Sequence, residues 1–90
     1  MKFRDAMRNL WTVEERPPSR MGKTNGKPDM GQTCFGPKKV WINKRSSLKK
    51  KRQTAVHEAI HIECPDLDEA AVFRAELTVC ALLRLYGMDI

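Results

Sequence analysis

The only two histidines of this chain, His57 and His61, lie four residues apart, and Glu58 follows the first of them. Positions four apart on an α-helix lie one turn apart and about 40° from each other around the axis, so one metal ion can take both imidazoles. Glu58 is rotated off that line, where its carboxylate can accept a proton from a water that the ion activates. The pattern His-Glu-x-x-His on a helix is typical of catalytic zinc. The sequence therefore predicts a Zn²⁺ cofactor, with Glu58 as general base.

One helix is expected to carry this motif. Ser46 and Ser47 are candidate N-caps ahead of it, and Cys64-Pro65 is expected to stop it, because proline cannot continue a helix. Between these limits mostly apolar residues recur at helical spacing, and the histidine motif occupies the opposite face. The pattern favours a helix that is apolar on one side and carries the chemistry on the other.

A second helix is expected to follow at once. Asp66-Leu67-Asp68-Glu69 resembles a capping box in which Asp66 is the cap and Glu69 is the third helical residue. The helix is predicted to run to about Tyr86 and to end at Gly87 in the C′ position. Its many Ala, Leu, Val and Phe residues predict that it is largely buried, and we favour core over a dimer contact for Leu82, Leu83 and Leu85. The two helices should form an antiparallel hairpin.

The second helix is also expected to supply an oxygen ligand, because a catalytic zinc normally has three protein ligands and one open position. Glu69 and Glu76 are the candidates, since they lie seven residues apart and share one face of that helix. Glu69 is preferred because it is nearer the turn, where an antiparallel helix passes alongside His61. Glu76 remains the alternative, or a carboxylate that orients a histidine through its other ring nitrogen.

Beyond the motif, the chain resembles the gluzincin-type zincin metallopeptidases, especially their smallest single-domain members, which are often encoded by phages and mobile elements. The resemblance covers roughly residues 31 to 87 and rests on four segments: Gly31 to Phe35, Lys39 to Asn43, Thr54 to His61, and Asp66 to Phe73. It implies a minimal zincin-like fold and hydrolysis of a peptide or protein substrate. It also implies His57, His61 and Glu69 as zinc ligands, with Glu58 as base.

Cysteine supplies a competing site. Cys64 follows His61 on the same helical stripe, so His57, His61 and Cys64, with Cys34 as fourth ligand, could form a closed structural zinc site in which Glu58 has no role. Cys80 is expected to be an ordinary small apolar side chain. Three cysteines without a paired framework or a secretory segment favour a reducing compartment, so we expect a cytoplasmic protein.

Ninety residues predict a single domain, 1–90, with a mobile loop at about 16–30 that is rich in proline and glycine. Gln32 to Phe35 and Lys39 to Asn43 are expected to form two strands of a small antiparallel sheet packed on the helix pair, which makes the class α+β. Trp11 to Glu15 also has strand composition. Val40 to Ile42, or the neighbouring strand, could bind an extended peptide by strand addition, and the competing interpretation is a core strand.

Charge is divided unevenly along the chain. Residues 1–56 carry 15 Lys/Arg against 4 Asp/Glu, whereas residues 57–90 carry 2 against 7. The run from Lys44 to Arg52 places cations near a helix N-terminus, which the helix dipole disfavours by a few tenths of a kcal/mol each. Nucleic acid is therefore a possible partner through this run. A non-catalytic zincin-fold module that binds nucleic acid or a protein is the alternative to an enzyme. No apolar run predicts a membrane partner.

Overall fold

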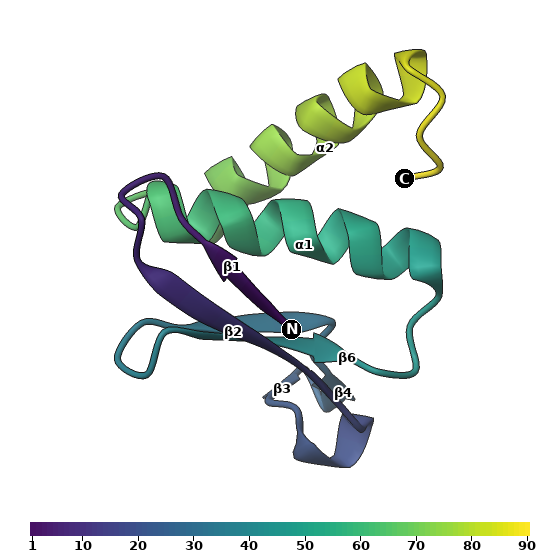
Figure 1. The fold of residues 1–90 in the computed structure, drawn as a ribbon. Helices are drawn as coiled ribbons and strands as arrows, with labels where there is room; N and C mark the ends of the chain where they lie inside the picture. The colour runs from purple at the N-terminus through teal and green to yellow at the C-terminus, as the bar shows by residue number, and fades with distance from the viewer.

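A computed structural model describes residues 1–90. Figure 1 shows three layers: a sheet, a first helix across it, and a second helix packed on the outer side of the first. The sheet has the strand order β1-β2-β6-β5, and the two helices are α1 and α2. The bounds are β1 Lys2–Arg4, β2 Leu10–Arg16, β5 Gly31–Cys34, β6 Lys39–Asn43, α1 Leu48–Glu63 and α2 Glu69–Leu85. The α+β class is confirmed.

The sheet is mixed. β5 and β6 form the expected antiparallel hairpin, with Thr33 opposite Val40. β2, however, lies parallel to β6, with Val13 opposite Val40, and β1 pairs antiparallel with β2 at the far side. The expectation of a wholly antiparallel sheet was therefore wrong. The connection from β2 to β6 includes β5, which runs antiparallel to both strands. It therefore brings the chain back to the end of the sheet where β2 begins, so that β6 can run parallel to β2.

The segment 16–30, expected to be a loop, contains local structure. A 3₁₀ turn, η1 (Pro18–Arg20), precedes a two-stranded hairpin of β3 (Lys23–Thr24) and β4 (Lys27–Pro28). Asn25 and Gly26 have φ of 53° and 76°, the left-handed values that a two-residue type I′ hairpin turn needs. Met21 is buried within this segment.

The motif-carrying helix α1 begins and ends close to its expected limits. The Ser47 side chain accepts a hydrogen bond from the backbone N–H of Lys50 at 3.1 Å, so Ser47 is the N-cap. The helix ends at Glu63, and Cys64 is the C-cap residue. Thr54 and Glu58 are its two buried residues. They lie one turn apart, and α1 contacts both β5 and β6.

The second helix differs from expectation at its start. Asp68, not Asp66, is the N-cap, because its carboxylate accepts the N–H of Ala71 at 2.8 Å. Glu69 is thereby the first helical residue and not the third. The end is as expected: Gly87 has φ of +85°, and Met88 N–H bonds to the Leu83 carbonyl in a Schellman arrangement.

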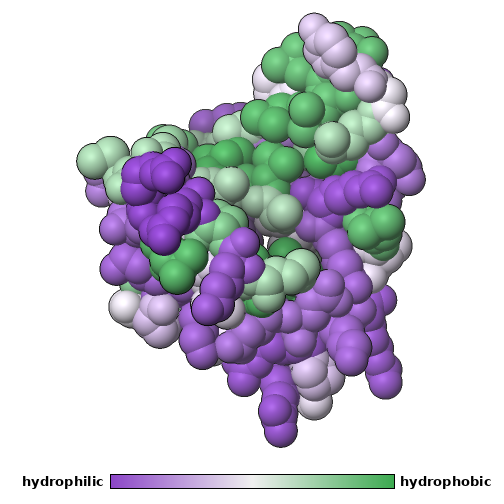
Figure 2. All heavy atoms as spheres, viewed as in Figure 1, coloured by the Kyte–Doolittle hydropathy of each residue, from purple (hydrophilic) through white to green (hydrophobic).

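Burial of α2 is lower than expected. Only Val72, Glu76 and Cys80 are buried, while Leu82 and Leu85 are 57% and 79% exposed. The prediction that these leucines belong to the core was wrong, because α2 packs on α1 and the sheet lies beyond it. Figure 2 shows apolar side chains at the surface over the end of α2.

The main core lies between the sheet and α1. Trp11, Val40 and Ile42 form its buried centre, and Phe3, Val13 and Ile62 pack around them. Neither α1 nor α2 combines the length and apolar content that crossing a bilayer requires.

Candidate metal centre

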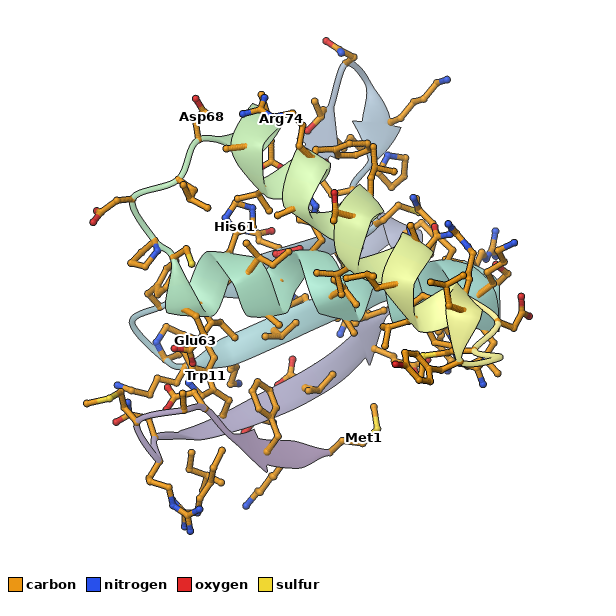
Figure 3. The ribbon with its side chains drawn as sticks, turned by 90° about the horizontal axis from the view of Figure 1, so that it is seen from above. Met1, Trp11, His61, Glu63, Asp68 and Arg74 are labelled. Atoms are coloured by element: carbon orange, nitrogen blue, oxygen red, sulfur yellow. The ribbon has the colours of Figure 1, made fainter.

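A cleft of about 390 Å³ opens beside α1, bordered by the start of α2 and by β5. Its lining includes the three side chains of the histidine motif and both candidate glutamates of α2: His57, Glu58, His61, Glu69 and Glu76. Segments that are far apart in the sequence, β5, α1 and α2, therefore meet at this cleft. Figure 3 shows His61 between α1 and the first turn of α2, where the chain has just passed Asp68.

Three of these residues offer converging donor atoms. Nε2 of His57 lies 2.5 Å from Oε1 of Glu69, and Nε2 of His61 lies 2.9 Å from Oε2 of the same carboxylate. One ligand atom from each residue lies within 4.8 Å of the others, and no second group of this kind exists in the chain. The helical spacing aligns the two imidazoles, and the short connection to α2 places Glu69 across from them.

The donor set fits zinc. Two imidazoles and one carboxylate are a known combination for an open catalytic site, with one position left for water or substrate. Bonds of about 2.0–2.1 Å in tetrahedral geometry put neighbouring donors about 3.3 Å apart, which lies between the 2.5 Å from His57 to Glu69 and the 4.8 Å within which all three donors fall. The Glu69 side chain is 70% exposed and is free to adjust its position.

Glu76 takes the position of a supporting residue. It is buried, and its Oε1 lies 2.8 Å from Nδ1 of His57. A carboxylate at this place favours the tautomer that carries its proton on Nδ1, which leaves the Nε2 lone pair free for a metal. Of the two roles open to Glu76, the geometry therefore favours orientation of His57, and Glu69 is the carboxylate that faces both imidazoles.

Glu58 is placed in a different environment from the other carboxylates. It is only 5% exposed, and its Oε1 accepts a hydrogen bond from the Thr33 hydroxyl at 2.9 Å. Burial raises the pKa of Glu58, while the Thr33 hydrogen bond and the nearby His57 and His61 act in the opposite direction. A raised carboxyl pKa suits a group that must take up a proton and release it again.

Gly31 and Thr33 of β5 are site residues that sequence reasoning missed. A Cβ on Gly31 would lie 2.3 Å from Cγ2 of Thr54 and 3.0 Å from Oε2 of Glu58. Glycine thus lets β5 approach α1 closely enough for Thr33 to reach the glutamate. A glycine at the start of an expected strand was the available signal, since such a residue often marks close backbone approach.

The alternative site built on cysteine is not assembled. Cys64 is exposed at the end of α1, and it does not belong to the donor group of His57, His61 and Glu69. Cys34, on β5, is likewise outside this donor group, and burial raises the pKa of its thiol. Cys80 is buried, as expected for a small apolar side chain. The structure therefore brings no cysteine into the donor group, and the arrangement favours Glu69 as the third ligand.

Comparisons of the chain with protein-family models, with curated proteins and with solved structures found no match. A functional proposal accordingly rests on the cleft and its side chains.

Proposed function

We propose that this protein is a zinc-dependent metallopeptidase whose metal is held by His57, His61 and Glu69. The observation that carries the proposal is the convergence of these donors in a cleft where Glu58 is buried beside them. Zinc in such a site polarises a carbonyl and lowers the pKa of a water molecule. Three free cysteines favour a reducing compartment, and we propose the cytoplasm.

Glu58 acts as the general base. Its carboxylate takes a proton from the water as the water oxygen bonds to the scissile carbonyl carbon, and it gives that proton to the leaving nitrogen as the C–N bond breaks. Thr33 donates to Oε1 and so fixes the carboxylate while the second oxygen remains available. Burial raises the pKa of Glu58, which favours proton uptake by its carboxylate during the reaction.

The substrate peptide binds along β5. β6 has neighbours on both sides, so Val40 to Ile42 cannot accept a further strand, and that earlier option was wrong. β5 is the free edge of the sheet next to the cleft. Asn43 N–H bonds to the Met30 carbonyl, and antiparallel alternation then directs the backbone groups of Gly31 and Thr33 outward. An extended peptide can pair with these groups.

The test combines metal content with hydrolysis. Purified protein is assayed for zinc by elemental analysis and for cleavage of a quenched fluorescent peptide library, beside Glu58→Gln, Glu69→Ala and Cys64→Ser. Glu58→Gln should retain zinc and lose hydrolysis by about 10²-fold or more. Glu69→Ala should lose zinc, and Cys64→Ser should match the wild type.

Two results would contradict the proposal. The first is wild-type protein that takes up no zinc even when the metal is added. The second is hydrolysis that survives in Glu58→Gln, which would remove Glu58 from the reaction. Retained zinc with no cleavage of any peptide by the wild type would favour the non-catalytic alternative.

A further inference from the structure

Six cationic side chains at one end of the molecule have no acidic partner. Lys39, Lys49 and Lys51 each lie within 4.0 Å of a carboxylate oxygen. Six other cations, which form no ion pair, lie on η1, the β3–β4 hairpin, the β6–α1 turn and the first turn of α1. They are Arg20, Lys23, Lys27, Lys44, Arg45 and Lys50. We call these six the cationic end. All but Lys50 are exposed.

Tertiary hydrogen bonds hold these segments together. The Asn43 side chain donates to the Asp29 carbonyl at 3.2 Å, which joins the base of the hairpin to the end of β6. The same side chain accepts the Arg45 N–H at 3.0 Å, which fixes the turn into α1. Figure 2 shows hydrophilic side chains gathered over the lower part of the molecule, where Figure 1 places the β3–β4 hairpin. The sequence run from Lys44 to Arg52 is therefore only part of the positive surface.

From this surface we infer that the cationic end binds the phosphate backbone of double-stranded nucleic acid. Small polar residues are interspersed with these cations along the sequence: Ser19, Thr24, Asn25, Ser46 and Ser47. Hydroxyl and amide groups interspersed with Lys and Arg are typical phosphate partners, whereas protein interfaces need apolar centres and are depleted in lysine. An acidic protein is the less favoured partner for that reason.

Two further features favour a duplex contacted through its backbone. α1 begins within the cationic end and has no acidic residue in its first turn, so its N-terminal backbone N–H groups add to the positive field. None of the six cations is on a segment that presents an exposed aromatic residue, and the Trp41 ring of β6 already carries the Arg16 guanidinium at 4.0 Å from its centroid, so stacking on unpaired bases is not favoured here. The expected binding is therefore tolerant of sequence and strongly dependent on salt.

The test measures anisotropy of a labelled mixed-sequence DNA duplex of about 20 base pairs, long enough for several phosphate contacts. With all six cations engaged, affinity should fall by about 10³-fold between about 50 and 200 mM salt. The variant Lys44→Gln/Arg45→Gln should weaken binding by about tenfold or more at 100 mM salt and reduce the salt slope by about two. Lys2→Gln/Arg74→Gln removes the same charge from other elements and should bind within about twofold of wild type.

Three outcomes would overturn the inference. One is the absence of duplex binding at low salt, and another is equal weakening by the two double variants, which would reflect net charge alone. The third is displacement of the duplex by poly-glutamate at equal charge concentration, which would identify an acidic polypeptide as the partner.

This inference is independent of the proposed peptidase. Glu58→Gln should bind the duplex like wild type, since Glu58 lies in the interior and not among the six cations. Loss of hydrolysis and loss of duplex binding are therefore separate results from separate variants, and either proposal can fail while the other stands.

Discussion

The carboxylate of Glu76 lies 2.8 Å from Nδ1 of His57, while Nε2 of the same ring lies 2.5 Å from Glu69. The imidazole is therefore held between two glutamates from the same face of α2. Glu76 is buried and Glu69 is exposed, so the two carboxylates differ in mobility as well as in position. This difference supports the proposed roles of Glu76 as the residue that orients His57 and of Glu69 as the metal ligand.

Removal of the orienting carboxylate should weaken metal binding without abolishing it. We expect Glu76→Ala to lower zinc affinity by about 10- to 100-fold, because the carboxylate partner of a ligating histidine fixes its tautomer and raises its basicity. Glu76→Gln should fall between Glu76→Ala and wild type, since an amide oxygen still accepts from Nδ1–H but carries no charge. Competition with a zinc indicator measures both values. Equal affinity of Glu76→Ala and wild type would remove Glu76 from the metal site.

Close approach of β5 to α1 should make Gly31 intolerant of a side chain. We expect Gly31→Ala to lower the free energy of unfolding by about 1–3 kcal/mol, because the new Cβ overlaps Cγ2 of Thr54. Thr54→Ser removes that methyl and keeps the hydroxyl, which donates to the Lys50 carbonyl at 2.8 Å. The double variant should therefore recover most of the loss in urea unfolding. If the losses in free energy of unfolding from the two single variants simply add in the double variant, the overlap between the new Cβ and Cγ2 of Thr54 is not the cause.

The turn between β1 and β2 should contribute stability that depends on pH. Asp5 accepts hydrogen bonds from Trp11 Nε1 at 2.8 Å and from the backbone N–H groups of Met7 and Asn9. These bonds, the one from Trp11 first, hold the pKa of Asp5 below its ordinary value despite the opposing effect of burial. A lowered folded-state pKa means that the stabilisation is present above the unfolded pKa and is lost as the pH falls through the folded one.

The difference in melting temperature between wild type and Asp5→Asn isolates this contribution. Any other effect of acid, such as loss of a bound metal, acts on both proteins and cancels in the difference. We expect wild type to have the higher melting temperature at about pH 7 and the two curves to converge as the pH falls through the lowered folded-state pKa of Asp5, where its carboxyl becomes protonated. Thermal unfolding followed by circular dichroism across this range makes the comparison. A difference that stays constant with pH would exclude the carboxylate charge as its source.

The left-handed backbone conformation of Gly87, just after the end of α2, should make this position sensitive to substitution. Gly87→Ala is expected to lower the free energy of unfolding by about 1 kcal/mol, because φ of +85° is strained for an L side chain. Gly36→Ala is the matched control, since a Cβ meets nothing within 4 Å at either glycine and Gly36 lacks a positive φ. Its effect should stay within about 0.5 kcal/mol in urea unfolding. Equal effects of the two substitutions would exclude backbone strain as the cause.

Features encoded within one segment were predictable from the sequence. Spacing alone aligned His57 and His61 on α1, and local residue chemistry limited the cap to Ser46 or Ser47 and predicted the stop at Gly87. The β5–β6 hairpin followed from the two expected strands at Gln32 to Phe35 and Lys39 to Asn43. These relationships span only a few residues, so helical and strand periodicity fix them without reference to the rest of the chain.

Features that join distant segments required the tertiary structure. The choice between Glu69 and Glu76 depends on where the first turn of α2 lies against α1, and the shift of the cap from Asp66 to Asp68 alters that start. The parallel pairing of β2 with β6 depends on the path of the long connection between them.

The sequence by itself determined which side chains could do chemistry here and that two of them share one helix face. Only the tertiary structure decided that Glu69 meets both imidazoles, that Glu58 is buried under β5, and that separate cationic segments gather at one end. The physical reason is that periodicity sets directions around a single element, whereas distances between elements depend on packing and strand pairing across the whole chain.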